Sequence, residues 1–198
     1  MEWLLEYERE WFLTVNGSHT NWQDHLMFMF VSIWVWLPLF LFPLYFIIRK
    51  RKEWLSVLLC TILTGATSVI VTEVFVKPLF KRYRPTRHPS FMNDITIVND
   101  YIASGDYGFI SGHSTNAFAF AVMSALIVKN KWYSAIIFIW AVIMVYSRVY
   151  LGVHFITDVV PGMVIGSFIG WFLYLLYRCM QYKKEGLKQK NRNDYDSF

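Results

Sequence analysis

An uncharged run from Leu26 to Ile48 most constrains the fold of this chain, because it is long enough to cross the ~30 Å hydrocarbon core of a bilayer as a helix. A second run, 54–76, contains Glu73 as its one ionisable residue. After a polar stretch, apolar character returns in three further runs, at 110–128, 132–148 and 158–178. Backbone groups inside lipid must be hydrogen-bonded within their own segment, so all these runs are expected to be helices. The sequence therefore predicts an all-α integral membrane bundle with about five transmembrane helices.

The composition agrees with this prediction. Of the 198 residues, 56% are hydrophobic and 17% are charged, whereas soluble domains average about 45–50% apolar and about 25% charged. The 17 Phe, 12 Tyr and 9 Trp residues provide more apolar surface than one small core can bury. These figures exclude a disordered chain and a disulfide-based scaffold. The two cysteines, Cys60 and Cys179, lie in or beside apolar runs and are interpreted as small hydrophobic residues.

The first 13 residues differ from the runs that follow. Trp3, Leu4, Tyr7 and Trp11 recur at helical spacing on one face, and three glutamates share another face. A segment of this kind carries too much charge to span the bilayer. It predicts an amphipathic helix that lies in the membrane interface, and the alternative is a helix packed against the bundle.

The distribution of basic residues predicts the orientation, because cytoplasmic loops are rich in Lys and Arg. Twelve of the 19 basic residues follow the first, third and fifth runs, which places them on one side of the membrane. That side is expected to be cytoplasmic, with the N-terminus outside, in a bacterial inner membrane. Residues 1–180 are expected to form one membrane domain, and 181–198 a polar cytoplasmic tail that frays. The net charge of +5 is explained by this asymmetry, so no nucleic-acid partner is predicted.

Three polar blocks adjoin the apolar runs, and the predicted topology places all three on the outer face. They are Lys77-Pro-Leu-Phe-Lys-Arg-Tyr-Arg84-Pro85, Ser111-Gly112-His113, and Ser147-Arg148 followed by His154 and Asp158. Because the topology rests on charge alone, the convergence of the three blocks on one face independently indicates a functional site.

The residue types in these blocks suit a phosphate group. Lys77, Arg84 and Arg148 supply fixed positive charge and many N–H donors. Ser111 and Gly112 precede an apolar helical run, so their N–H groups can face an anion from the N-terminus of a helix. The first two blocks and Arg148 therefore predict an anion site.

Two histidines supply the reactive groups. His154 and Asp158 are four residues apart, which is one helical turn, so the carboxylate can fix the tautomer of the imidazole. His154 is then free to attack through its other nitrogen, and His113 can act as a general acid. The pattern predicts nucleophilic catalysis of phosphoryl transfer.

Several neighbouring polar residues admit two interpretations. Ser147 either hydrogen-bonds the phosphate or caps a helix. Glu73 is interpreted as an ion-pair partner that positions Lys77, and the alternative is a direct functional role. Lys81, Arg82 and Arg87 either contact lipid headgroups or are solvated. The loop at 86–109 is long for a compact domain, which predicts a lid or a specificity element.

The blocks resemble the signature of the type 2 phosphatidic acid phosphatase superfamily of membrane lipid phosphatases, a group related to vanadium haloperoxidases. That signature is Lys-x6-Arg-Pro, Pro-Ser-Gly-His and Ser-Arg-x5-His-x3-Asp. Ten residues of this chain match it: Lys77, Arg84, Pro85, Ser111, Gly112, His113, Ser147, Arg148, His154 and Asp158. Ile110 stands where the family has proline, which affects the backbone before the helix and none of the reactive side chains.

The resemblance implies a metal-free phosphoryl transfer in two steps, without a cofactor. His154 would form a phosphohistidine, Asp158 would orient it, and His113 would protonate the leaving oxygen and then activate water. The phosphate would be held by Lys77, Arg84, Ser111, Gly112 and Arg148.

The expected function is hydrolysis of a lipid phosphate or diphosphate monoester at the extracytoplasmic face. The expected partners are this substrate and membrane lipids. Undecaprenyl diphosphate is favoured as substrate, and phosphatidylglycerol phosphate, phosphatidic acid and a lipid A phosphate also fit the family. The alternative is an anion or lipid-phosphate transporter that uses the same basic cluster.

Overall fold

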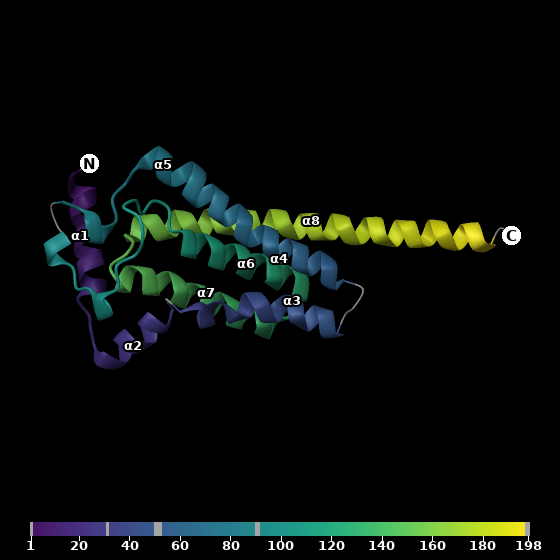
Figure 1. The fold of residues 1–198 in the computed structure, drawn as a ribbon, viewed down its shortest axis with the longest axis horizontal. Helices are drawn as coiled ribbons and strands as arrows, with labels where there is room; N and C mark the ends of the chain where they lie inside the picture. Colours follow the sequence, from purple (N-terminus) through teal and green to yellow (C-terminus); the bar gives the residue numbers. More distant parts are fainter. Residues whose placement is uncertain (1, 31, 50–52, 90–91, 197–198) are drawn as a thin grey trace.

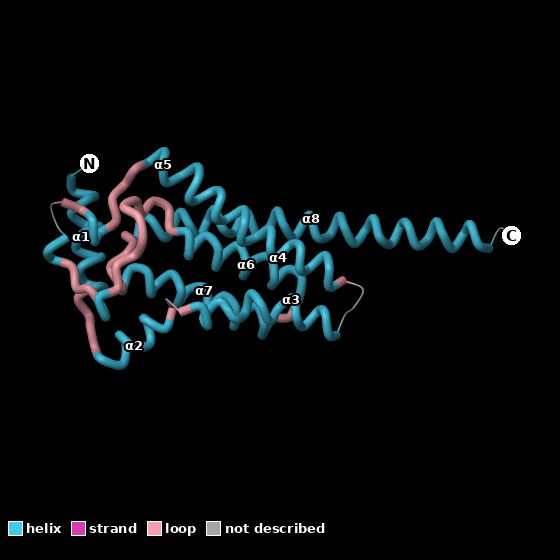
Figure 2. The backbone as a smooth tube through the Cα atoms, viewed as in Figure 1, coloured by secondary structure: helices cyan, strands magenta, loops and turns pink. Residues whose placement is uncertain are grey.

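The computed structural model describes residues 2–30, 32–49, 53–89 and 92–196, and within these ranges all the long elements are helices. The lengthwise helices of the bundle are α3 (Leu37–Arg49), α4 (Trp54–Val69), α6 (Gly112–Val128), α7 (Lys131–Tyr150) and α8 (Ile156–Asp196). Helix α1 (Glu2–Asn16) lies across one end of this bundle (Figure 1). Most of the loop between α5 (Lys77–Phe80) and α6 gathers at the same end (Figure 2).

Within the described ranges, three helices are long and apolar enough to cross a membrane. They are Trp54–Phe80, Lys131–Tyr150 and Ile156–Leu187. Helix α6 is apolar but shorter. The prediction of an all-helical membrane architecture is confirmed at this level.

The first apolar run, 26–48, is not a single helix, which corrects the sequence-based expectation. The chain forms α2 (Asn21–Met29), a short 3-10 turn (Ile33–Trp36) and then α3. Pro38 is the second residue of α3. Proline is tolerated in the first turn of a helix and disrupts its interior, so a new helix begins just before Pro38.

Close packing of α6 on α8 forms the centre of the bundle. Gly166 and Gly170 of α8 face the backbone of α6, because a Cβ atom on either would lie 2.2 Å from a carbonyl oxygen, that of Thr115 or of Ala119. Small residues at every fourth position allow membrane helices to approach this closely. The contact brings the N-terminus of α6 beside that of α8, which joins the second and third polar blocks.

Helix α4 passes from α-helical to π-helical winding at its C-terminal end. Residues Ile70–Val76 are π-helical and lead into the short α5. Single π turns of this kind occur frequently at functional sites. The segment carries Glu73 and ends directly before Lys77, so it determines where the first polar block begins.

Helix α1 is docked on the bundle, as the alternative interpretation of the N-terminal segment had it. Phe12 is fully buried, and its ring centroid lies 5.3 Å from that of Phe155. The Asn16 amide donates hydrogen bonds to the carbonyl oxygens of Thr96, over 3.0 Å, and Tyr150, over 2.9 Å. The N-terminal helix is therefore part of the polar end of the molecule.

The docked face of α1 differs from the face predicted to be apolar. Glu8, Phe12 and Asn16 point to the bundle, whereas Tyr7 and Trp11 are 60% and 64% exposed. The side chains of Trp3 and Leu4 lie outside the described residues. The exposed aromatic rings remain available to the membrane interface, while the docked face carries mainly polar partners.

Helix α8 continues to Asp196, so the expected fraying from Gln181 onward is corrected. The segment contains four Lys, two Gln and one Glu, which are good helix formers, and it contains no proline. Lys184 also donates a hydrogen bond to Ser56 of α4 over 2.9 Å. Figure 1 shows this part of α8 extending past the end of the bundle opposite α1.

Candidate active site

The three polar blocks meet at the end of the bundle on which α1 is docked. Lys77 lies at the start of α5, Arg84 shortly after α5, His113 in the first turn of α6, Arg148 in the last turn of α7, and His154 just before α8. All five line one cavity of about 180 Å³. Pockets that enclose a drug-sized ligand measure about 300–1,000 Å³, so this cavity suits a single headgroup.

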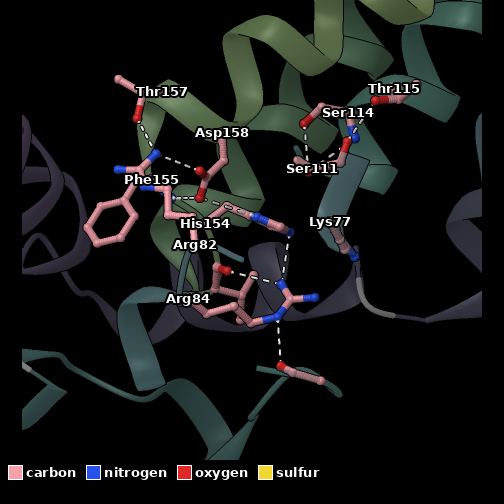
Figure 3. Close-up of polar contacts among 12 residues, drawn as sticks. Lys77, Arg82, Arg84, Ser111, Ser114, Thr115, His154, Phe155, Thr157 and Asp158 are labelled. Carbon is pink, nitrogen blue, oxygen red and sulfur yellow. Dashed lines mark hydrogen bonds and ion pairs between the residues drawn. The ribbon is translucent and has the colours of Figure 1, made fainter. Parts of the chain in front are cut away.

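His154 is 2% exposed, and its two ring nitrogens have different neighbours. Arg84 Nη1 lies 3.0 Å from Nε2, and Nδ1 lies 3.6 Å from Asp158 Oδ2 (Figure 3). A guanidinium has only donors, so Nε2 accepts this hydrogen bond and the ring proton is on Nδ1. Burial lowers the pKa of His154 to about 4, because its effect, together with the positive charge of Arg84, outweighs the opposing effect of Asp158, which raises the pKa. The ring is therefore neutral at neutral pH.

Asp158 is fully buried, and each of its carboxylate oxygens has a hydrogen-bond donor. Oδ2 accepts from the backbone N–H of Phe155 over 2.9 Å, and Oδ1 accepts from Arg82 Nη1 over 2.7 Å. The backbone carbonyl of Asp158 also accepts from the N–H of Ser111 over 3.0 Å. These contacts fix the carboxylate opposite the protonated nitrogen of His154.

Arg84 is held by backbone carbonyl groups on two sides. Its Nε donates to Gly105 over 3.0 Å, Nη2 donates to Ser104 over 3.2 Å, and Nη1 donates to Val153 over 3.2 Å. Pro85, which is buried, follows it at the start of a 3-10 turn. The guanidinium is thus oriented before any ligand binds.

Lys77 is only 9% exposed, and its ammonium contacts the carboxylate of Glu73. The ion pair that the sequence suggested is therefore formed, and both residues line the cavity. A Cβ atom on Gly112 would lie 3.3 Å from the Glu73 carboxylate and from the Thr72 hydroxyl. Glycine at this position lets the N-terminus of α6 approach the π-helical segment.

Ser111 is the N-cap of α6, with its Oγ accepting hydrogen bonds from the backbone N–H of Ser114, over 3.4 Å, and from the Ser114 hydroxyl, over 3.0 Å. The cavity is lined by the next two residues, Gly112 and His113. The His113 ring packs against Trp36, with centroids 5.4 Å apart. The hydroxyl of Ser111 thus supports the helix, and the first turn of that helix faces the cavity.

Arg148 is 1% exposed and is anchored by two neighbours. Nη2 donates to the Phe30 carbonyl over 2.8 Å, and Nε and Nη2 donate to the Ser147 hydroxyl over 3.1 and 3.0 Å. Nη1 is buried and has no hydrogen-bond partner among the described residues. Ser147 is not among the residues that line the cavity, and its hydroxyl contacts the Arg148 guanidinium instead.

A model of the PAP2 superfamily matches residues 53–184, which include all three blocks. The chain belongs to this superfamily. It is 37% identical over 179 residues to the lipid A 4'-phosphatase of Porphyromonas gingivalis, covering 89% of this chain and 75% of the relative. It is 31% identical over 180 residues to the lipid A 4'-phosphatase of Bacteroides thetaiotaomicron, covering 89% and 79%.

Among solved structures, the fold is similar to that of the PAP2 type phosphatidylglycerolphosphate phosphatase from Bacillus subtilis. The TM-score is 0.68 at 24% identity, and the match covers 92% of this chain and 88% of the other. This likeness concerns the fold. The superfamily match and the two phosphatase relatives identify the protein as a membrane lipid phosphatase of the PAP2 superfamily, which favours hydrolysis over the transport hypothesis. Within the described ranges, no group of three or more His, Cys, Asp and Glu side chains is arranged to hold a metal ion.

The PAP2 signature does not include every residue at the site. The loop at 86–109 contributes Tyr101, Ala103 and Ser104 to the cavity wall. Arg82 was interpreted only as a headgroup contact or a solvated charge, yet it binds Asp158. Its position within the first polar block, two residues before Arg84, is the local sequence signal that Arg82 lies near the site.

Proposed function

We propose that this PAP2 phosphatase removes a phosphate monoester from the saccharide headgroup of a lipid A type glycolipid. The observation that carries the proposal is the single cavity lined by His113, His154 and three cationic side chains. The two lipid A 4'-phosphatases, each similar along 89% of this chain, support a glycolipid over undecaprenyl diphosphate, which the sequence alone had favoured. The cavity volume suits a phosphate with the lipid tails left outside.

In the first step, His154 Nε2 attacks phosphorus and the bond from phosphorus to the lipid oxygen breaks. Burial and the positive charge of Arg148 lower the pKa of His113 in the free protein, so the bound phosphate anion must favour its protonated form. His113 then donates this proton to the lipid oxygen, so a neutral alcohol leaves and a phosphohistidine remains. Asp158 stabilises the positive charge that develops on the imidazole, because its Oδ2 faces the protonated Nδ1. The neutral state of free His154 supports its role as nucleophile.

In the second step, the deprotonated His113 takes a proton from water, and the resulting hydroxide attacks phosphorus. The P–N bond breaks and its electrons return to Nε2, which releases inorganic phosphate and restores neutral His154. His113 has regained its proton, so both histidines are ready for another cycle.

Charge on the transferred phosphoryl oxygens would be stabilised by three cations and a helix N-terminus. Lys77, Arg84 and Arg148 all line the cavity, together with Gly112 at the start of α6. The unpaired Nη1 of Arg148 supports this role, because a buried guanidinium N–H requires an acceptor. We assign Ser147 to holding Arg148 and Ser111 to capping α6.

The inferred location of the site is the extracytoplasmic face of a bacterial inner membrane. The C-terminal end of α3, the α6–α7 junction and the C-terminal part of α8 lie at the end of the bundle away from the site (Figure 1). These segments carry the basic residues expected on the cytoplasmic side, which supports this orientation. In a Cys60→Ser, Cys179→Ser background, an impermeant maleimide should label Glu10→Cys in spheroplasts and Glu185→Cys only after lysis. The reverse pattern would place the site in the cytoplasm.

Phosphate release by the purified protein in detergent tests the function. The panel contains lipid A, undecaprenyl diphosphate, phosphatidylglycerol phosphate and phosphatidic acid, each assayed with a metal chelator present. We expect the highest kcat/KM on lipid A. A higher value on undecaprenyl diphosphate would overturn the substrate assignment and leave the phosphatase class intact.

Histidine variants test the mechanism. His154→Ala and His113→Ala should each lose phosphate release. After denaturation in alkaline detergent, which preserves the acid-labile P–N bond, His113→Ala should show less trapped phosphohistidine than the wild type. His25→Ala, which changes an exposed histidine of α2, should retain full activity. Full activity in His154→Ala would exclude the phosphohistidine.

A further inference from the structure

Arg82 is half-buried beside the active site, with 27% of its side chain exposed, and it is not among the residues that line the cavity. Its Nη1 donates to Asp158 Oδ1 over 2.7 Å, and its Nη2 donates to Glu8 Oε2 over 2.6 Å. The guanidinium carbon lies 4.6 Å from the centroid of the Phe155 ring, a favourable cation–π position. Figure 3 shows Arg82 between Thr157 and Asp158, on the side of Asp158 away from Lys77. Arg82 thus contacts the residue that orients the nucleophile and is not part of the cavity wall.

The second partner of Arg82 comes from the N-terminal helix. The Glu8 side chain is 8% exposed, and its other oxygen accepts a hydrogen bond from the Thr157 hydroxyl. A carboxylate this deeply buried is costly unless it is paired and hydrogen-bonded. Glu8 therefore links α1 to the start of α8 through Arg82 and Thr157, at the position where Asp158 lies.

The two oxygens of Asp158 divide its contacts. Oδ1 binds Arg82, whereas Oδ2 accepts from the Phe155 N–H and faces Nδ1 of His154. If Arg82 is removed, Oδ1 loses its charged donor inside a buried site, and the carboxylate is free to turn toward other N–H groups. Such a turn would move the acceptor away from the imidazole on which positive charge develops.

We propose that Arg82 is a positioning residue for phosphoryl transfer and that Glu8 holds it in place, so that docking of α1 completes the active site. This inference rests on the proposed function of His154 and Asp158. It assigns to α1 a catalytic consequence beyond membrane contact. Because Arg82 does not line the cavity, its loss should affect kcat and leave substrate affinity nearly unchanged.

The test is a double-mutant cycle of Glu8→Gln and Arg82→Gln on the purified full-length protein. Displacements of about 1 Å at a catalytic group cost on the order of 100-fold, so we expect Arg82→Gln to lower kcat by about 10- to 100-fold. KM and the inhibition constant of inorganic phosphate should stay within about twofold. Glu8→Gln should lower kcat less, and should have no further effect when Arg82 is already Gln.

Two conservative variants and two controls separate positioning from folding. Arg82→Lys keeps the charge without the planar fork and should recover part of kcat. Glu8→Gln keeps α1 docked through Phe12 and Asn16. Glu10→Gln and Arg178→Gln change exposed residues of α1 and α8, and both should match the wild type.

The possible outcomes distinguish this inference from the function on which it rests. Wild-type kcat in Arg82→Gln would overturn the positioning role while the phosphatase function stands. Equal losses from Glu8→Gln in both backgrounds would overturn the link through α1. Absence of phosphate release from the wild type on every lipid would overturn the proposed function, and this inference with it.

Discussion

Arg84 Nη1 donates a hydrogen bond to Nε2 of His154 over 3.0 Å, which is the nitrogen with the free electron pair. In the free protein this contact keeps the imidazole in the tautomer that has its proton on Nδ1. An arriving phosphate would offer its oxygens to the guanidinium and release the electron pair of Nε2. The same arginine would therefore select the reactive tautomer and bind the group to be attacked.

Replacement of Arg84 by lysine tests this double role. An ammonium on a flexible stem cannot make the fixed contacts to Gly105, Ser104 and Val153 and also reach Nε2. We expect Arg84→Lys to lower kcat/KM by about 100-fold or more, a loss typical of a transition-state donor. Steady-state kinetics on the best lipid substrate measure it. Arg178→Lys serves as the control, and comparable activity in the two variants would contradict the assignment.

The pH dependence of His154 follows from its burial. Burial lowers its pKa to about 4, below the ordinary value of about 6.5, so the ring stays neutral as pH falls from 7 and becomes protonated only near pH 4. The nucleophile is therefore expected to remain available at pH 5. Titration of ¹⁵N-histidine signals by NMR measures this, with His154→Asn identifying the resonance. A midpoint near 6.5 in the free protein would refute the prediction.

Ser147 is expected to act through Arg148. Ser147→Ala removes the acceptor shared by Nε and Nη2, which leaves a buried charged donor unsatisfied. Hydrogen bonds to charged groups contribute about 1.5–3 kcal/mol, so KM should rise by about 10-fold or more. Ser167→Ala is a matched control, because that hydroxyl donates to the Met163 carbonyl of its own helix and has no other hydrogen bond to the described part of the chain. Equal KM values for the two variants would argue against this role.

The glycines of α8 predict a stability effect. Gly166→Ala puts a Cβ atom 2.2 Å from the Thr115 carbonyl, so α6 and α8 must separate. Overpacking of this kind costs about 1–3 kcal/mol, or roughly 2–10 °C in Tm. Gly186→Ala meets no atom within 4 Å and should leave Tm unchanged or slightly raised, because alanine favours helix. Thermal unfolding in detergent compares the two, and an equal Tm would show that the helices do not pack through Gly166.

The sequence predicted which polar blocks would meet better than it predicted where each helix begins and ends. His154 and Asp158 lie one helical turn apart, and apolar runs fix which ends of neighbouring helices meet, so local spacing was enough to bring the blocks together. The run at 26–48 was misjudged because hydropathy is blind to Pro38 as a helix start. The local signal for the break is Pro38 itself, because proline is tolerated in the first turn of a helix and disrupts its interior.

The contacts of α1 could not be predicted, because their partners are distant in sequence. Glu8 pairs with Arg82, and Asn16 binds Thr96 and Tyr150, so polar residues form a docked face that periodicity assigns to solvent. The apolar pattern of Tyr7 and Trp11 describes the opposite, exposed face. The apolar pattern of one helix depends on the residues of that helix alone. It therefore cannot identify partners that the tertiary structure brings from elsewhere in the chain.

Because of the π-helical turn at Ile70–Val76, the position of Lys77 depends on the number of residues in this segment as well as on their types. Each α-helical residue advances the chain by about 100° and 1.5 Å. Loss of one residue here would restore a regular α-helix and rotate Lys77 by about that angle, away from the cavity wall, with every signature residue still present. A homologue that keeps the signature but lacks this extra residue would therefore carry its lysine in a different register, a difference that a comparison of motifs alone would overlook.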